Sequence, residues 1–124
     1  MRTAITGTLA VLGILTAAPA MGADLKPTLS IAKSTAPVGA DVPYTITVTP
    51  AAKAKGKRVR IQVKGIAAWR GIDSFRLGPS GRVEDDIEGY QPGVGRYRAL
   101  VVAKTGRVLA KSSVVSVVWT PREP

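Results

Sequence analysis

Two runs of charged residues are the parts of this sequence that could do chemistry. Clustered ammonium and guanidinium groups bind polyanions, and an arginine fork can hold a carboxylate or a phosphate through two parallel hydrogen bonds. The alternative interpretation of the basic run, PAAKAKGKRVRIQ, is a solvated loop that leads into a strand, and the pattern favours it. Within eight positions the run carries Lys53, Lys55, Lys57, Arg58 and Arg60.

The second run is acidic and reads EDDIE at residues 84–88. Several carboxylate oxygens can bind a hard cation, and a pair of carboxylates can cleave a glycoside. However, the run lacks the spacing of a calcium loop, and residues 84, 86 and 88 would share one exposed strand face rather than line a cleft. We therefore expect a solvated acidic face paired with Arg82 or another basic chain, with no metal and no catalytic pair.

One member of the acidic run needs a separate explanation. If Val83 and Ile87 point into a core, Asp85 points inward with them. An unpaired carboxylate is costly in that position. We therefore expect either a partner for Asp85 or a strand that is bulged or short.

The chain has no cysteine and no histidine. No disulfide can form, and metal sites or catalytic triads that use histidine are excluded. We therefore expect a non-catalytic protein without a cofactor, stabilised by its apolar core.

The first 23 residues have the pattern of a secretory signal peptide. Arg2 is followed by an apolar run over residues 4–18, and small residues stand at Ala18, Ala20 and Ala23. The run is shorter than the roughly 20 apolar residues that span a bilayer. We predict a signal-peptide helix within residues 1–23, cleavage after Ala20 or Ala23, and a product that is secreted or held at the extracellular surface.

The predicted mature chain is strongly basic. Without Arg2 it has 17 basic and 8 acidic residues, so its net charge is 17 − 8 = +9. Such an excess favours anionic partners. Secretion disfavours nucleic acid, so the expected partner is an anionic polysaccharide, another cell-envelope polyanion or an envelope protein. No second apolar segment follows, so no transmembrane segment is expected in the mature chain.

Beyond residue 24 the apolar residues recur with a period of two between proline- and glycine-containing turns, a pattern typical of half-buried strands. No helix is expected there. Seven strands in one domain over residues 24–120 predict an all-β, immunoglobulin-like Greek-key sandwich, followed by a polar tail at 121–124. The predicted strands are 28–33, 42–49, 57–64, 69–77, 82–87, 96–104 and 112–120.

The alternation also assigns faces to the strands. The inward sets are Tyr44, Ile46 and Val48, then Val59, Ile61 and Val63, then Tyr97, Ala99, Val101 and Ala103. Arg96, Arg98, Leu100 and Val102 would then point outward. The last strand has apolar residues on both faces, so its orientation stays open.

Several stretches resemble the immunoglobulin-like or fibronectin-III-like domains of secreted bacterial proteins. They are VGADVPYTITVTPAAKAKGKRVRIQV, then Trp69, then GPSGRVEDDIEGYQPGVGRYRALVVAKTG and SSVVSVVWT. Gly95 and Tyr97 match a Gly-x-Tyr at the start of strand F, and Ser80, Gly81 and Val83 match a turn into strand E. The resemblance implies adhesion, spacing, or carbohydrate or protein contact, with no shared catalytic residues. It also implies a tyrosine corner, in which the Tyr97 hydroxyl bonds to nearby backbone.

In that topology strands C and F are neighbours, so the arginines of residues 58–60 and 96–98 would lie side by side. Like charges on adjacent strands cost stability, which a bound anion would relieve. The predicted anion-binding residues are Lys53, Lys55, Lys57, Arg58, Arg60, Lys64, Arg96 and Arg98. The alternative is that these charges only keep an exposed strand soluble.

A protein-contact surface is the other candidate. Leu100 and Val102, with Val114 and Val118 beside them, would form an outward apolar patch, and such patches mark interaction sites. Trp69 follows a loop and could also contact a sugar or a protein, whereas Trp119 is expected to close the core. On this interpretation the chain is a structural or assembly module that pairs through strands F and G, which are the predicted strands 96–104 and 112–120, and a homo-oligomer is allowed.

Overall fold

The computed structural model of the chain describes residues 24–122. The predicted signal peptide and its helix, at residues 1–23, lie outside the described residues, as do the last two residues of the predicted tail. The described part is almost entirely β. Its elements are β2 (Lys26–Ile31), β3 (Thr35–Pro37), β4 (Asp41–Thr49), α1 (Ala51–Ala54), β5 (Arg58–Lys64), β6 (Trp69–Arg76), β7 (Arg82–Glu88), β8 (Gly93–Val102), β9 (Val108–Lys111) and β10 (Val115–Thr120).

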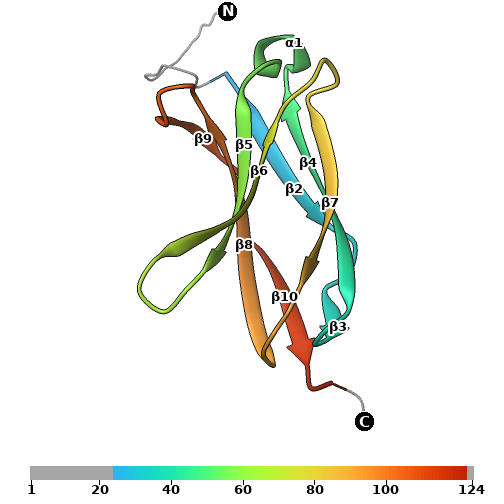
Figure 1. Cartoon of the computed structure of the whole chain (residues 1–124). Helices are drawn as coiled ribbons and strands as arrows, with labels where there is room; N and C mark the ends of the chain where they lie inside the picture. The colour runs from blue at the N-terminus through green and yellow to red at the C-terminus, as the bar shows by residue number, and fades with distance from the viewer. Residues whose placement is uncertain (1–23, 123–124) are drawn as a thin grey trace, which may run out of the picture.

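These strands form two sheets that face each other (Figure 1). The large sheet has the order β3-β10-β8-β5-β6, with β9 paired to β8, and the small sheet has the order β2-β4-β7. β3 pairs with β10 in parallel, and the other neighbours are antiparallel. The predicted immunoglobulin-like sandwich is confirmed, and each of the seven predicted strands is present.

Three short elements were not predicted. β3 and β9 have three and four residues, too few to show an alternation. The expectation of no helix beyond residue 24 was wrong, because the four residues Ala51–Ala54 form a single helical turn. Alanine and lysine have high helix propensity, and one turn is too short to leave a periodic signal in the sequence.

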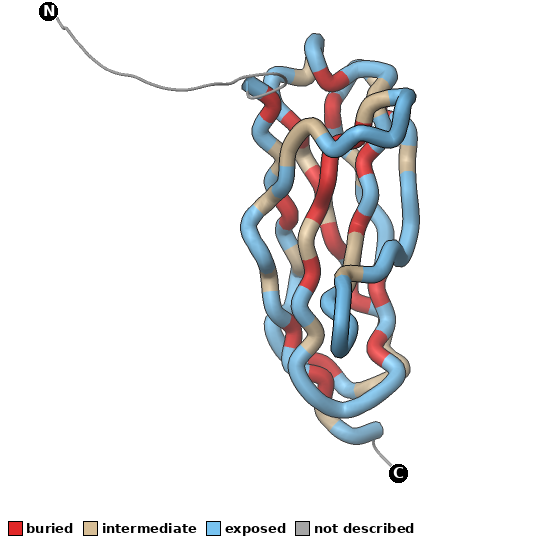
Figure 2. Tube along the Cα trace, turned by 90° about the vertical axis from the view of Figure 1, so that its left-hand side faces the viewer, coloured by how far each residue is buried: buried red, intermediate tan, exposed pale blue. Residues whose placement is uncertain are grey.

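The core lies between the sheets, and the predicted faces supply it. Buried and exposed residues alternate along the strands (Figure 2). The orientation of β10, which the sequence left open, is decided by Val117 and Trp119, which are buried, and Val118, which is exposed. The core of the domain consists of Leu25, Leu29, Ala36, Val42, Tyr44, Ile46, Val48, Ala54, Val59, Ile61, Leu77, Ile87, Tyr97, Ala99, Val101, Val117 and Trp119.

Trp119 closes one end of the core, as expected, but Tyr97 is bonded differently from a tyrosine corner. The Trp119 indole Nε1 donates a hydrogen bond of 2.9 Å to the Tyr97 hydroxyl oxygen. Gly89 and Gly95 lie against this pair, and a Cβ at Gly95 would lie 2.6 Å from the Tyr97 hydroxyl. The bond therefore joins β8 to β10 through two side chains, rather than a side chain to the backbone.

Candidate functional site

The outer face of the large sheet carries most of the predicted anion-binding residues. Arg58, Arg60 and Lys64 lie two or four residues apart on β5, so they share one face of the sheet. The register places Gln62 of this face opposite Arg98 of β8, and Arg96 is two residues before Arg98. The structure therefore brings the five expected residues of β5 and β8 together.

Two further basic residues belong to this face and were missed in the sequence. Arg76 pairs with Arg58, and Lys111 pairs with Leu100. A bulge in β6 near Ile72 lets Trp69 and Arg76 share a face although they are seven residues apart. Lys111 was missed because β9 was not predicted. We call Arg58, Arg60, Lys64, Arg76, Arg96, Arg98 and Lys111 the basic face.

The basic face has no carboxylate partner within the described residues. The ion pairs formed by residues 24–122 are Lys53 with Asp24 and Arg82 with Glu84, and neither includes a member of the basic face. Arg58 and Arg76 are direct cross-strand neighbours, a pairing of like charges that costs stability. An anion bound over the face would remove that cost.

Arg98 is held more firmly than the rest of the basic face. Its Nε donates a hydrogen bond of 2.9 Å to Oε1 of Gln62, and its Cζ lies 4.2 Å from the ring centroid of Trp69. The Lys64 ammonium lies over the same ring at 5.7 Å. Trp69 is half-buried by these contacts, so its ring serves as a support for cations.

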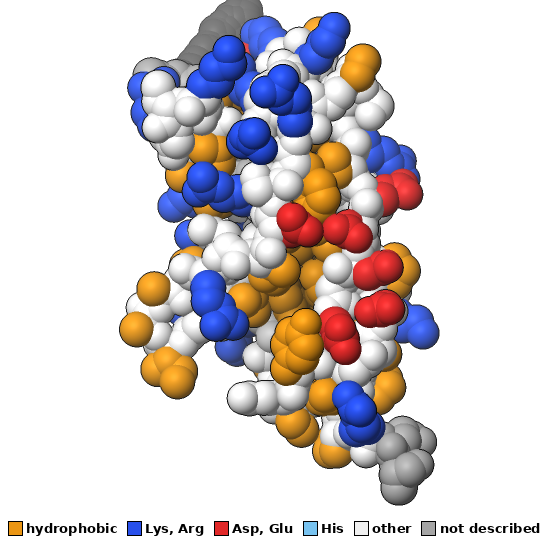
Figure 3. Space-filling view, viewed as in Figure 1, with side chains coloured by type: hydrophobic (Ala, Val, Ile, Leu, Met, Phe, Trp, Pro, Cys, Tyr) orange, Lys and Arg blue, Asp and Glu red, His pale blue; other side chains and the backbone are white. Residues whose placement is uncertain are grey.

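The lysines that precede β5 lie at one end of the sandwich, around α1, where Figure 3 shows Lys and Arg side chains gathered. The Gly56 N–H donates to the Leu77 carbonyl and the Leu77 N–H donates to the Lys57 carbonyl, which fastens this loop to the end of β6. Lys53 is paired with Asp24 and holds the pKa of that carboxyl below its ordinary value. Lys55 and Lys57 therefore add positive charge at this end of the sandwich, while the charge of Lys53 is partly compensated.

The apolar patch expected on strands F and G, which are β8 and β10 in the structure, is not exposed as predicted. Leu100 and Val102 lie outside the core cluster, as their parity predicted, but they are 3% and 1% exposed. The register puts Arg60 and Lys111 on either side of Leu100, and long basic side chains lay their aliphatic stems over apolar neighbours. Val114 and Val118 are 50% and 43% exposed, but Leu100 and Val102 are buried and add no apolar surface for a protein contact.

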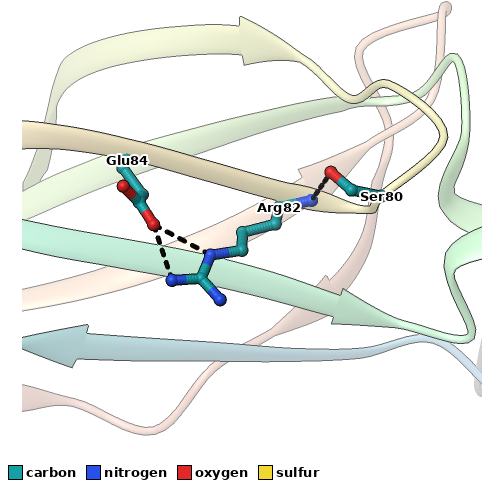
Figure 4. A network of polar contacts seen from close by, with 3 residues as sticks. All are labelled: Ser80, Arg82 and Glu84. Carbon is teal, nitrogen blue, oxygen red and sulfur yellow. Dashed lines mark hydrogen bonds and ion pairs between the residues drawn. The ribbon is translucent and has the colours of Figure 1, made fainter.

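The acidic run lies on β7, which is an edge strand of the small sheet. Glu84 accepts hydrogen bonds from Arg82 Nε at 3.0 Å and Nη2 at 2.6 Å, and the Arg82 N–H donates to the Ser80 hydroxyl (Figure 4). The pairing with Arg82 was predicted. Within residues 24–122 no group of three acidic side chains is close enough to hold a metal ion.

The expectation of a partner for Asp85, or of a bulged or short strand, was wrong, because Asp85 is exposed and has no ion-pair partner among residues 24–122. Asp85 pairs with Tyr44 and has inward parity, but it is exposed because β7 is an edge strand. Burial is the largest cause of the raised pKa of the Tyr44 hydroxyl, followed by the negative charges of Asp85, Asp73 and Asp86. Tyr44 therefore lies in the core with carboxylates of β6 and β7 near its hydroxyl.

A groove of about 1120 Å³ lies between the β5–β6 hairpin and the β7–β8 loop. Its lining includes four exposed apolar side chains, which are Ile66, Ile72, Tyr90 and Val94. Lys64, Arg70 and Arg96 also line the groove, as do Asp41, Asp86 and Glu88. Figure 3 shows hydrophobic side chains gathered beside a line of Asp and Glu. The sequence did not reveal this groove, because its exposed apolar side chains come from two loops and two different strands that only the fold brings together.

Among the described residues no helix is long and apolar enough to cross a membrane. No family model matches the chain, and no curated protein sequence is significantly similar to it. Solved structures are similar in fold alone. A CARDB domain from Pyrococcus furiosus, crystallised in complex with di-metal ions, has a TM-score of 0.55 and 18% identity over 81% of this chain and 94% of that domain.

The solution structure of the same domain gives a TM-score of 0.54 and 16% identity over 78% of this chain and 94% of that one. A β-1,2-glucanase from Parabacteroides distasonis has a TM-score of 0.51 and 20% identity over 89% of this chain, but only 15% of the glucanase is covered. At these identities the comparisons show an immunoglobulin-like fold and carry no residue role to this chain.

Proposed function

We propose that this protein is a secreted, non-catalytic binding module whose basic face contacts an anionic polymer of the cell envelope. The observation that carries the proposal is the gathering of seven basic side chains on one sheet face with no carboxylate partner among residues 24–122. The neighbouring CARDB fold is that of an immunoglobulin-like module, which agrees with a binding role. Secretion rests on the predicted signal peptide.

The shape of the basic face favours a linear polymer over a single small anion. From Arg58 to Lys64, β5 advances six residues, and at about 3.3 Å per residue the face is about 20 Å long. A polysaccharide or another envelope polymer with several negative charges can contact the whole length at once. A small anion would contact one or two arginines and leave the other like charges uncompensated.

A contact with an envelope protein through the groove is the second candidate. The relative exposures of Ile66 and Tyr90, 106% and 81%, favour a protein contact. Apolar residues that are exposed together along one groove mark interaction sites. We prefer the groove to the expected pairing through β8 and β10 (strands F and G), because Leu100 and Val102 of that surface are buried. The dependence of binding on salt concentration distinguishes the two candidates, because dissolved ions weaken contacts between exposed charges but do not weaken a contact that buries apolar surface.

The test is binding of the chain from Asp24 onward, which contains the complete sandwich, to isolated anionic envelope polymers over a series of salt concentrations. The test variant replaces Arg58, Arg60, Arg96 and Arg98 with Ser. The control variant removes the same charge elsewhere, by replacing Lys26, Lys33, Lys104 and Arg107 with Ser; these four are exposed and lie outside the basic face.

We expect binding that weakens steeply with salt, falls more than tenfold in the test variant and changes little in the control variant. Equal losses in both variants would mean that net charge alone attracts the polymer. Absence of binding at low salt would refute the role of the basic face and direct attention to the groove.

A further inference from the structure

Arg98 differs from the other arginines of the basic face in how it is held. Arg58, Arg60, Arg76 and Arg96 are exposed, and their side chains make no hydrogen bond to any residue that the structure describes. Arg98 is half-buried and has two restraints, the hydrogen bond from its Nε to Gln62 and the Trp69 ring beside its guanidinium plane. Its side chain is therefore ordered before any ligand arrives.

The restraints leave the ligand-binding edge of the guanidinium available. A guanidinium has five N–H donors, and the one used here is on Nε. The two Nη groups, with four N–H donors, have no acceptor among residues 24–122. Since the hydrogen bond and the ring contact limit rotation about the last bonds of the side chain, the paired Nη edge has a defined direction.

A fork of this kind recognises a specific chemistry. Two parallel N–H donors match two oxygens in one plane, as in a carboxylate or on one phosphate group. The entropy of ordering a long side chain is lost on binding at a flexible arginine, whereas at Arg98 it has already been lost on folding. Lys64, over the same Trp69 ring, and Arg96, on the same strand, supply positive charge around the bound group.

We propose that Arg98, oriented by Gln62 and Trp69, forms a subsite that binds one oxyanion group of the polymer through a bidentate contact, and that it sets the specificity of the basic face. The remaining arginines attract the polymer without selecting the geometry of its anions. This inference rests on the proposed function and adds the identity of the anchoring residue.

The experiment compares substitutions that keep the net charge. Arg98→Lys removes the fork, and Arg60→Lys is the matched control on an exposed arginine of the same face. Gln62→Leu removes the acceptor that orients Arg98 and also leaves the charge unchanged. Each protein is titrated with polygalacturonate, which carries carboxylates, and with long-chain polyphosphate, at one fixed salt concentration, and thermal unfolding confirms that each variant is folded.

We expect Arg98→Lys to weaken binding about tenfold, Arg60→Lys to weaken it less than twofold, and Gln62→Leu to weaken it about threefold. Trp69 supplies a second readout, since a group bound at Arg98 should change its fluorescence in the unaltered chain and not in Arg98→Lys. A larger Arg98 effect with polygalacturonate assigns the subsite to carboxylates, and a larger effect with polyphosphate assigns it to phosphates.

Two results would overturn the inference, and they are distinguishable. If the unaltered chain binds a polymer but Arg98→Lys and Arg60→Lys lose the same affinity, the anchoring role of Arg98 is refuted while the proposed function stands. If the unaltered chain binds neither polymer, the proposed function and the subsite are refuted together.

Discussion

Replacing Gly89 with alanine should destabilise the domain, because the new methyl group would occupy the position of the Trp119 ring. A Cβ built on Gly89 overlaps three ring atoms of Trp119. The ring cannot move away easily, since it is 4% exposed and its Nε1 is bonded to the Tyr97 hydroxyl. The backbone at Gly89 or the indole must therefore shift.

The magnitude follows from two contributions. Overpacking in a close-packed interior costs about 1–3 kcal/mol, and loss of the hydrogen bond between Trp119 and Tyr97 costs about 0.5–1.5 kcal/mol. The free energy of unfolding should fall by about 2–4 kcal/mol, a large share of the 5–15 kcal/mol typical of a domain. For a domain of this size each kcal/mol lowers Tm by about 4–8 °C, so we expect a decrease of at least about 8 °C.

The assay is urea unfolding followed by tryptophan fluorescence, which reports the exposure of buried Trp119. The control is Gly71→Ala on β6, because a Cβ at Gly71 meets no atom within 4 Å. That variant should unfold within about 0.5 kcal/mol of the unaltered chain. A loss below about 0.5 kcal/mol for Gly89→Ala, or equal losses in both variants, would refute the packing argument.

Two further predictions concern burial and ionisation. Leu100→Ala should lower the free energy of unfolding by about 2–4 kcal/mol, because Leu100 is only 3% exposed. Val114→Ala is the control, and because Val114 is 50% exposed it should change the free energy of unfolding by less than about 0.5 kcal/mol. If urea unfolding gives similarly small effects for both variants, Leu100 is not covered in solution. The pKa of the Tyr44 hydroxyl is raised in the folded state, so as the pH rises above the ordinary pKa of 10.0 the tyrosine of the unfolded chain ionises first. The contribution of Tyr44 to the free energy of unfolding is therefore fully present below that pH and is lost above it. Unfolding midpoints measured from pH 8 to 11 should therefore fall more for the unaltered chain than for Tyr44→Phe, and parallel curves would contradict this reasoning.

Much of the fold could be predicted because its signals are local. Alternation along one strand identifies inward residues such as Ile46 and Val59 without knowledge of the partner strand. The position of Trp119 in the core and the pairing of Glu84 with Arg82 were also predicted, since each depends on spacing within one strand or on a large apolar side chain. β3, β9 and α1 were missed because each is too short to establish a period.

The candidate site could be predicted only in part. The resemblance to immunoglobulin-like domains suggested that β5 and β8 are neighbours, so Arg58 and Arg98 were expected on one surface. Their contacts could not be foreseen, because the hydrogen bond from Arg98 to Gln62 joins residues 36 positions apart. Exposure of Leu100 was predicted from parity alone, which identifies the face of a residue but not what covers it.

The amino-acid sequence by itself determined the β-rich character of the chain, the inward faces of most strands, the excess of positive charge, and the absence of cysteine and histidine chemistry. These properties depend on composition and on neighbours in the chain. The tertiary structure alone decided that the bulge near Ile72 places Trp69 and Arg76 on the same face, that Leu100 is buried between Arg60 of β5 and Lys111 of β9, and that Trp69 supports Arg98. The bulge depends on the register between β5 and β6, and the surroundings of Leu100 and Trp69 depend on strands that are not neighbours in the sequence. Register and packing across strands therefore decide which side chains meet.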